Sequence, residues 1–487
     1  MASKLNVVFA VSEFDGIVKT GGLADAAGAL APVMKASGHN VKVVMPAYRS
    51  ALEKVDTEVV ASGCLAMNHT QYHQGAMWFS VRYAEFRGID VYFIEYNEFF
   101  DRAGIYDENG QGYFDNSRRF AFFSRAVLTA CQMLDFRPDV IHCHDWQAAL
   151  LPYYLRVDEC RNPFFDRTGT LLTIHNAAYQ QHTDSSMLDE LGIAWRYFNP
   201  ACFEDCGQIN LLKGGISFAD RINTVSPQYA RELLTDEGSH GLVESFLRRE
   251  KDLTGILNGC DYTQWNSETD SLIPALFSRE DLSGKEQCKT ALQDRMELPV
   301  NSAVPVYGLV SRLASQKGFD YLIPALWKFL NEDVQVVLLG SGDAGTAARL
   351  EHLAASFPGK CRFYNGFDNT LAHWIEAGSD FFLMPSLFEP CGLNQIYSLK
   401  YGTLPVVRRV GGLSDTVDSY SEHGTRGTGF IFDSTDSNEL HACLRLSLEV
   451  YGSPAEFSSM QKQAMSKSFT WETAARAYCS VYQSILP

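Results

Sequence analysis

The stretch VQVVLLGSGDAG, residues 334–345, decides the fold class of this chain. Val334–Leu339 is a short apolar run of the length of a buried strand, and the glycine-rich residues 340–345 follow it directly and precede a predicted helix. A strand, a glycine loop and a helix in this order make up the repeating unit of a parallel sheet covered by helices. The loop matches G-x-G-x-x-G, the dinucleotide fingerprint. The match lies in the second half of the chain, however, and the end of the next candidate strand, Arg362–Asn365, holds no acidic residue. A nicotinamide site is therefore not favoured.

Strand-length apolar runs recur along both halves of the chain, separated by helix-length amphipathic segments. Runs of this kind are typical of parallel sheets that are buried on both faces. Nine or more of them exceed one common doubly wound sheet, so the sequence predicts α/β architecture with two sheets. The predicted strands are 6–11, 41–46, 91–95, 140–144 and 171–175 in the first half and 304–310, 334–339, 381–385 and 404–407 in the second.

A turn-rich segment marks the predicted boundary between two domains. Asn258-Gly259-Cys260-Asp261 has turn chemistry, and a polar connector follows it. We therefore expect a first domain over residues 1–262 and a second over 263–470. The last segment, 471–487, is predicted to be a helix that could return to pack on the first domain.

The composition is that of a packed globular enzyme. The 487 residues are 46% hydrophobic and 20% charged, which excludes a disordered chain, a collagen and a coiled coil. Lysine and arginine total 41 against 58 aspartates and glutamates, a net charge of −17. This charge argues against nucleic acid or an anionic membrane as the main partner. No apolar run approaches the ~18 residues that a membrane span needs.

The cysteines and the N-terminal segment favour a reducing compartment. The 12 cysteines are scattered, and no C-x-x-C pair occurs among them. The apolar run Val7–Val11 is too short for the core of a signal peptide. We expect free thiols and a cytoplasmic protein.

Charged residues follow the predicted strands of the second half. Arg312 and Lys317 come after the strand 304–310, and Glu389 comes after the strand 381–385. Ligands of open α/β sheets bind at the carboxyl ends of the strands. Arginine grips phosphate with two parallel hydrogen bonds, and lysine adds a point charge. The pair is therefore a candidate phosphate clamp, with a solvated surface loop as the alternative.

Two double-glycine turns echo each other in the two halves. Gly21-Gly22-Leu23-Ala24-Asp25 recurs as Gly411-Gly412-Leu413-Ser414-Asp415, each with a basic residue two positions ahead, Lys19 and Arg409. A glycine pair at a helix start exposes backbone N–H groups, which suits a phosphate or a carboxylate. Ordinary loop-to-helix starts are the alternative.

Histidines end two predicted strands of the first half. His142, His144 and Asp145 lie at the end of one strand, and His175 and Asn176 lie at the end of the next. Such residues could bind a metal, but neither H-E-x-x-H nor D-x-D occurs in the sequence. We expect no metal centre, a structural role for His142 and His144, and a substrate contact for His175.

These motifs together resemble the ADP-glucose-using α-glucan synthases, the bacterial glycogen synthases and plant starch synthases. Lys19–Asp25 is similar to the family signature K-T-G-G-L-x-D, and Glu389–Leu393 to its E-P-C-G-L segment. Other segments that resemble the family follow in the expected order: 142–146, 173–176, 312–318, 400–405 and 410–416.

The resemblance implies an architecture, a reaction and a set of site residues. The fold would be of the GT-B type, two Rossmann-like doubly wound domains with the active site in the interdomain cleft. The reaction would be retaining transfer of glucose from ADP-glucose to the non-reducing end of an α-1,4-glucan such as glycogen, without metal or other cofactor. The implied catalytic residues are His175, Arg312, Lys317 and Glu389. The implied donor-binding residues are Lys19, Gly21, Gly22, Asn258, Gly342, Phe367, Cys391, Gly392, Leu393 and Asn394, and the acceptor-side residues are Asp25, Tyr106, Asp145 and Asn176.

Two of these positions depart from the family pattern. Phe367 stands where the family often has a tyrosine stacked on adenine, and Asn394 stands where a threonine usually follows E-P-C-G-L. Two other functions stay open: a retaining GT-B transferase with another donor or acceptor, and a weakly active glucan-binding relative.

Overall fold

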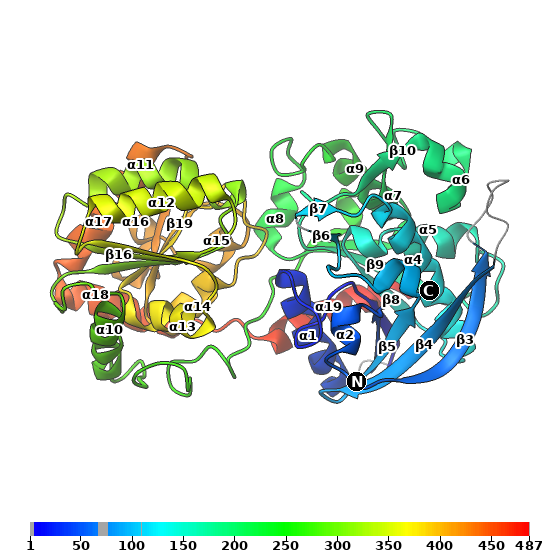
Figure 1. Cartoon of the computed structure of the whole chain (residues 1–487), viewed down its shortest axis with the longest axis horizontal. Coiled ribbons are helices and arrows are strands. Elements are labelled where there is room, and N and C mark those ends of the chain that lie inside the picture. Colours follow the sequence, from blue (N-terminus) through cyan, green and yellow to red (C-terminus); the bar gives the residue numbers. More distant parts are fainter. Residues whose placement is uncertain (1–3, 67–75, 109, 487) are drawn as a thin grey trace. The chain divides into compact units, whose positions relative to one another are not determined.

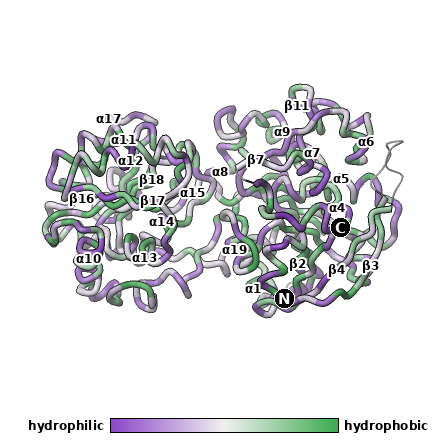
Figure 2. Tube along the Cα trace, in the orientation of Figure 1, coloured by the Kyte–Doolittle hydropathy of each residue, from purple (hydrophilic) through white to green (hydrophobic). Residues whose placement is uncertain are grey.

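The computed structural model describes residues 4–66, 76–108 and 110–486, which form two compact units. The first comprises Met1–Asn258 and Trp471–Pro487, and the second comprises Gly259–Thr470. The first boundary thus falls after Asn258 rather than at residue 262. Hydrophobic segments run along the inner strands of each unit, for example at β2 and β18 (Figure 2).

The first unit is built on a nine-stranded sheet in the order β14-β13-β9-β8-β1-β2-β5-β4-β3 (Figure 1). The strands from β14 to β5 pair in parallel, and β4 and β3 extend the sheet in antiparallel fashion. The bounds of these strands are β1 Asn6–Ala10, β2 Asn40–Pro46, β3 Glu58–Ala66, β4 Ala76–Phe86, β5 Ile89–Glu95, β8 Val140–His144, β9 Gly169–Ile174, β13 Arg221–Thr224 and β14 Leu253–Gly255.

Smaller strands and the helices complete this unit. The short strands are β6 Asp107–Glu108, β7 Gln111–Gly112, β10 His182–Asp184, β11 Glu204–Asp205 and β12 Gln208–Asn210. The helices are α1 Gly22–Ala36, α2 Arg49–Leu52, α3 Asn97–Phe100, α4 Asn116–Met133, α5 Leu150–Val157, α6 Leu188–Leu191, α7 Leu211–Phe218, α8 Pro227–Glu232, α9 Val243–Arg248 and α19 Trp471–Ile485.

The second unit has a six-stranded parallel sheet in the order β17-β16-β15-β18-β19-β20. Its strands are β15 Val306–Val310, β16 Gln335–Gly340, β17 Cys361–Asn365, β18 Phe381–Met384, β19 Leu404–Arg408 and β20 Phe430–Phe432. Its helices are α10 Ser283–Arg295, α11 Phe319–Phe329, α12 Ala344–Ser356, α13 Asn369–Gly378, α14 Asn394–Lys400, α15 Gly411–Thr416, α16 Tyr420–His423, α17 Ser437–Tyr451 and α18 Pro454–Met465.

Alternate residues of the central strands pack into two separate hydrophobic cores in the second unit. Val336 and Leu338 of β16 pack with α11, α12 and α17, whereas Val337 and Leu339 pack with α10 and α13 on the opposite face (Figure 1). Side chains along a strand point alternately to the two faces of the sheet. A strand that is covered by helices on both faces therefore needs apolar residues at every position, which explains the continuous runs of the sequence.

Both sheets reverse their strand order at one point. Counted along the chain within each unit, the parallel strands are ordered 3-2-1-4-5-6, and the first unit has a seventh beyond the sixth. The reversal falls between β1 and β8 in the first unit and between β15 and β18 in the second. Ligands of doubly wound sheets bind outside the carboxyl ends of the strands at this switch point. The fold thus predicts one ligand-binding edge in each unit.

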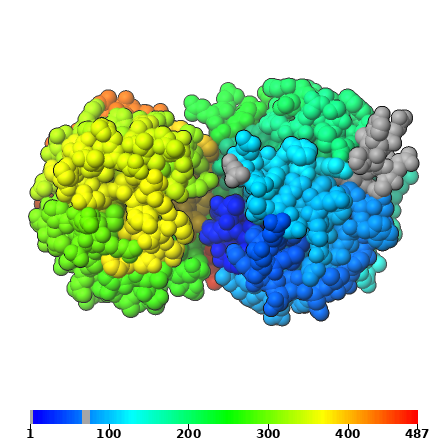
Figure 3. Space-filling view, in the orientation of Figure 1, coloured from blue at the N-terminus to red at the C-terminus, as the bar shows by residue number. Residues whose placement is uncertain are grey.

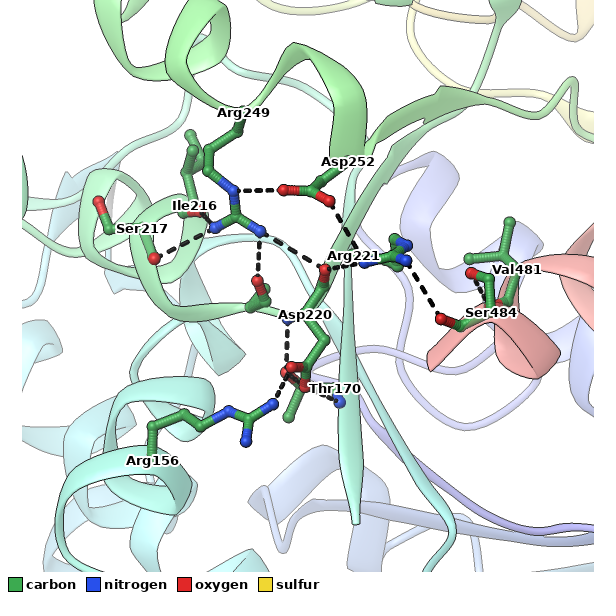
Figure 4. A network of polar contacts seen from close by, with 11 residues as sticks. Arg156, Thr170, Ile216, Ser217, Asp220, Arg221, Arg249, Asp252, Val481 and Ser484 are labelled. Atoms are coloured by element: carbon green, nitrogen blue, oxygen red, sulfur yellow. Dashed lines mark hydrogen bonds and ion pairs between the residues drawn. The ribbon is translucent and has the colours of Figure 1, made fainter. Parts of the chain in front are cut away.

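The C-terminal helix α19 belongs to the first unit, where it packs on α1 and β9 (Figure 1). Arg221 at the start of β13 donates to the backbone oxygen of Ser484 near the end of α19 (3.1 Å) and to Asp252 (3.2 Å) (Figure 4). Arg249 in turn donates to the other carboxylate oxygen of Asp252 (2.9 Å) and to backbone oxygens at the end of α7. This network satisfies the last carbonyls of two helices and fixes α19 to the sheet.

No helix among the described residues is long and apolar enough to cross a membrane.

Candidate functional site

The second unit holds a pocket of about 190 Å³ at its switch point. The walls come from the carboxyl ends of β15 and β18 and from the segments that follow them. The polar and charged lining residues include Ser311, Arg312, Lys317, Ser386, Glu389 and Asn394. Arg312, Lys317 and Glu389, which the sequence placed after two different strands, therefore line the same pocket.

Lys317 and Glu389 form an ion pair in this pocket. The Lys317 Nζ lies 2.6 Å from Glu389 Oε2, and the Ser386 hydroxyl donates to the same oxygen at 2.8 Å. Glu389 is buried. Two donors on one carboxylate oxygen fix its position, and the carboxylate holds the ammonium group at the pocket wall.

Arg312 is exposed and differs from Lys317 in having no hydrogen-bond or ion-pair partner for its guanidinium group among the described residues. A guanidinium group presents five donors in a planar fork that matches a phosphate. An unpaired arginine beside a paired lysine gives the pocket a net positive charge.

The glycine loop 340–345 supports the Arg312 segment. Leu313 and the loop exchange backbone hydrogen bonds: its N–H donates to the Ser341 oxygen (2.8 Å), and its oxygen accepts from the Asp343 N–H (2.8 Å). A side chain at Gly342, which has a φ of +147°, would collide with the Leu313 backbone. The glycine is thus required for close packing of two loops, and Asp343 caps α12 through its own side chain.

The E-P-C-G-L-N segment forms the other wall of the pocket. Gly392, Leu393 and Asn394 line it, and the Asn394 amide donates to the Val310 oxygen at the end of β15 (2.8 Å). Cys391 is buried and lies outside this lining. Phe367, by contrast, is 87% exposed, so its ring is open to a ligand and does not belong to the core.

In the first unit, a buried glutamate that the sequence analysis missed organises the loop before α1. Glu13 accepts hydrogen bonds from the Thr20 N–H (2.5 Å) and hydroxyl (2.8 Å), from the Gly21 N–H (3.2 Å) and from the Tyr106 hydroxyl (2.8 Å). Its place just after the buried strand β1 was the signal that could have found it. The Tyr106 hydroxyl therefore helps to hold the loop before α1 through its hydrogen bond to Glu13.

Lys19 is held by acidic side chains. It pairs with Asp25 of α1 and lies 3.6 Å from Asp15, and its side chain is about half exposed. Burial raises the pKa of Asp25, and the ammonium of Lys19 opposes that rise. Two of the predicted residues, Lys19 and Asp25, thus contact each other.

The double-glycine turn of the first unit is open. A side chain at Gly21 or Gly22 would meet no atom within 4 Å, and no side chain caps α1. Part of the N-terminal segment, in dark blue, lies on the surface of the first unit (Figure 3). The first turn of this helix can therefore receive an anion.

The double-glycine turn of the second unit is closed, which agrees with the alternative of an ordinary loop-to-helix start. The Gly412 N–H bonds to the backbone oxygens of Glu389 (3.0 Å) and Pro390 (3.2 Å). Side chains at Gly411 and Gly412 would collide with the backbone of the Glu389–Cys391 segment. This turn supports the pocket wall and exposes no anion site. Arg409 pairs with Glu422 and Asp433.

Residues from the ends of β8 and β9 meet beside the switch point of the first unit, which lies between β1 and β8. Asp145 Oδ1 accepts from the His175 N–H at 2.6 Å, and the rings of His144 and His175 share a hydrogen bond of 3.0 Å. Burial raises the pKa of Asp145 to about 7 and lowers that of His175 to about 3. Asn176 accepts from the Ala178 N–H (3.0 Å) and shapes the loop beyond.

Asn258, the last residue before the second unit, is buried, and its side-chain oxygen has no partner in the part of the chain that the structure describes. Within the described ranges, no group of three or more His, Cys, Asp or Glu side chains could hold a metal ion. No disulfide joins cysteines of the described residues.

Comparison with known proteins relates these features to one family. The profile described as "Starch synthase catalytic domain" matches residues 6–249, and "Glycosyl transferases group 1" matches 292–464. Glycogen synthases of Aeromonas salmonicida and Vibrio cholerae are each 44% identical to this chain. Both alignments cover 99% of this chain, together with 98% of the Aeromonas protein and 99% of the Vibrio protein.

Solved structures agree with this assignment. The catalytic domain of starch synthase IV from Arabidopsis thaliana, bound to ADP and acarbose, has a TM-score of 0.86 at 31% identity, with 99% of both chains covered. Sucrose-phosphate synthase from Thermosynechococcus elongatus shares the fold alone, with a TM-score of 0.59 at 17% identity and 99% of both chains covered.

Two Rossmann-like units and these profile matches define a glycosyltransferase of the GT-B class. Within that class, the chain belongs to the glycogen synthase and starch synthase family. The resemblance noted in the sequence is confirmed.

Proposed function

We propose that this enzyme transfers glucose from ADP-glucose to the non-reducing end of an α-1,4-glucan, with retention of the α configuration, in glycogen biosynthesis. The names of the bacterial relatives support the reaction, and the ADP and acarbose bound to the plant starch synthase support the classes of donor and acceptor.

The observation that carries the proposal is the pocket with Arg312 unpaired beside Lys317. Cleavage of the bond between glucose and phosphate moves negative charge onto the leaving ADP. Fixed cations stabilise this charge more in the transition state than in the ground state, which is how they accelerate the reaction. Arg312 binds the leaving diphosphate by its fork, and Lys317 adds its charge at the same oxygens.

Glu389 contacts the hydroxyl groups of the donor glucose. Its carboxylate is already fixed by Lys317 and Ser386, so its remaining lone pairs are presented without further ordering. Backbone groups of Gly392, Leu393 and Asn394 complete the phosphate subsite, with Cys391 packed behind them.

Residues of the first unit bind sugar and phosphate groups. Lys19 and the open turn Gly21-Gly22 contact the donor, and His175 contacts the transferred glucose. The acceptor glucan lies along Asp25, Tyr106, Asp145 and Asn176. Three of these four act by shaping the site, because Asp25 holds Lys19, Tyr106 holds Glu13 and Asp145 holds the backbone of His175.

The remaining donor residues act on the nucleoside and its surroundings. Phe367 offers an exposed ring face for adenine, and stacking depends on that face rather than on a hydroxyl group. Gly342 holds the Arg312 segment, and the unpartnered oxygen of Asn258 is available to a donor hydroxyl.

Two cations at the leaving group take the part that a divalent metal plays in other transferases, so we propose that the reaction needs no metal or cofactor. Its partners are ADP-glucose and an α-glucan rather than nucleic acid or membrane, and its place is the cytoplasm.

The test is glucan elongation measured with ADP-glucose and with UDP-glucose on glycogen, each with and without excess EDTA. We expect the higher kcat/KM with ADP-glucose and no loss in EDTA. A preference for UDP-glucose would identify another retaining transferase, and absence of turnover with both donors would identify a glucan-binding relative. A collapse in EDTA that Mg²⁺ restores would contradict the charge argument.

A further inference from the structure

Two buried histidines at the end of β8 have no part in the proposed function. His142 and His144 are 0% and 1% exposed, and their ring centroids lie 4.1 Å apart. Burial lowers the pKa of both rings well below the ordinary value, so both are neutral. A neutral imidazole has one N–H donor and one acceptor nitrogen, and the partners of each ring decide which is which.

The partners of His142 occupy both of its nitrogens. The Asn223 amide nitrogen donates to the Thr224 oxygen, which orients the amide, and the Thr173 hydroxyl donates to Asn223 Oδ1. Because that hydroxyl proton is used, Thr173 accepts from His142 Nε2 at 2.5 Å. His142 Nδ1 then accepts from the Tyr482 hydroxyl of α19 at 2.8 Å. His142 is therefore a fully satisfied structural residue.

His144 differs, because only one of its nitrogens has a partner among the described residues. Its Nδ1 lies 3.0 Å from His175 Nε2, and its Nε2 is buried without a hydrogen bond. Buried N–H groups without a partner are rarer in native proteins than buried acceptors without one. The proton of His144 therefore lies on Nδ1, from which it donates to His175 Nε2.

This bond determines the state of His175. Since its Nε2 accepts, its own proton must lie on Nδ1, which has no partner among the described residues, and the residue is partly exposed. Asp145, the neighbour of His144, holds the His175 backbone N–H at 2.6 Å. Consecutive residues from the end of β8 thus fix the ring and the main chain of His175.

We infer that His144 is a positioning residue that locks His175 in the Nδ1–H tautomer, so that a neutral donor faces a hydroxyl oxygen of the transferred sugar. The inference rests on the proposed function for the identity of the sugar, but the tautomer itself does not depend on it. Residues that orient an active-site histidine in this way typically contribute 10- to 100-fold to activity, by analogy with metal-bound histidines.

Two substitutions separate positioning from packing. His144→Asn keeps an N–H donor one bond from Cγ, as in histidine Nδ1, whereas His144→Leu fills similar space without a donor. We expect His144→Leu to lower kcat at least tenfold with little change in KM for ADP-glucose, and His144→Asn to recover most of the loss. Tyr482→Phe is the matched control, because it breaks the bond to His142 and leaves the donor to His175; it should lower Tm without changing kcat. Equal losses in the Asn and Leu variants would contradict a positioning role.

The tautomer can be measured on the wild-type protein without any turnover. Nitrogen-15 NMR of histidine-labelled enzyme distinguishes a protonated from an unprotonated ring nitrogen, and the His175→Gln variant assigns the His175 signals. We expect a protonated Nδ1 and an unprotonated Nε2 in His175. A protonated Nε2 would overturn the inference even if ADP-glucose is the donor, whereas the expected tautomer in a protein inactive with ADP-glucose would overturn the proposed function alone.

Discussion

The two double-glycine turns have nearly the same sequence and opposite roles. In the first unit, a side chain added at Gly21 or Gly22 would meet no described atom within 4 Å. Glu13 takes the Gly21 N–H, but no described side chain caps the helix that begins at Gly22. In the second, Gly411 and Gly412 are pressed against the backbone of the Glu389 loop, whose oxygens take the Gly412 N–H. A glycine can serve a ligand or a neighbouring chain segment, and the motif alone does not distinguish the two.

The largest expected effect comes from Lys317, whose partner Glu389 lies in the loop that the closed turn packs against. Lys317→Ala should lower kcat by about 10²–10³, because removing one group that stabilises the developing charge costs roughly that much. The measurement is single-donor kinetics with ADP-glucose. Circular dichroism should show an intact fold. Near-normal turnover would exclude Lys317 from the clamp.

The basic residues ahead of the two turns give the next contrast. Lys19→Ala should lower kcat/KM for ADP-glucose about 10- to 100-fold, since a hydrogen bond to a charged group contributes about 1.5–3 kcal/mol. Arg409→Ala is the control: its ion pairs with Glu422 and Asp433 are exposed, and such pairs contribute about 0–1 kcal/mol of stability. Equal losses in both variants would mean that the two turns do not differ in function.

A substitution in the closed turn should change stability instead of donor binding. Gly412→Ala places a methyl group on the Cys391 backbone, so we expect the free energy of unfolding to fall by about 1–3 kcal/mol. Thermal and denaturant unfolding measure this. An unchanged stability would show that the Glu389 loop moves aside freely, and the turn would then not be a support.

The smallest expected effect concerns Phe367, which we propose contacts the adenine base of the donor rather than its phosphates. Phe367→Tyr should leave KM for ADP-glucose unchanged or lower it, because the added hydroxyl offers at most one hydrogen bond of about 0.5–1.5 kcal/mol. Phe367→Ala removes the stacking face and should raise KM clearly. If KM stays constant in the alanine variant, Phe367 does not contact the base.

The sequence predicted the central strands of both units because apolar runs reflect burial on two faces. Among the longer strands it missed β3 and β4, which pair in antiparallel fashion and show only partial burial along β4. It also missed the short strands β13, β14 and β20. It located Arg312, Lys317 and Glu389 because charged residues at strand ends are easily recognised. It could not show that Glu389 pairs with Lys317, that Glu13 organises the first turn, or that the second turn is closed, since each depends on contacts between distant segments.

The most direct test of this account is the pair of values, KM for ADP-glucose and free energy of unfolding, measured for Gly22→Ala. The account predicts that KM rises about tenfold, a loss of about 1.4 kcal/mol of binding, because the methyl group occupies space meant for the donor. The free energy of unfolding should stay within about 0.5 kcal/mol of wild type, because that methyl group meets no protein atom. An unchanged KM, or a loss of stability like that expected for Gly412→Ala, would contradict the claim that the first turn is the open, donor-binding one.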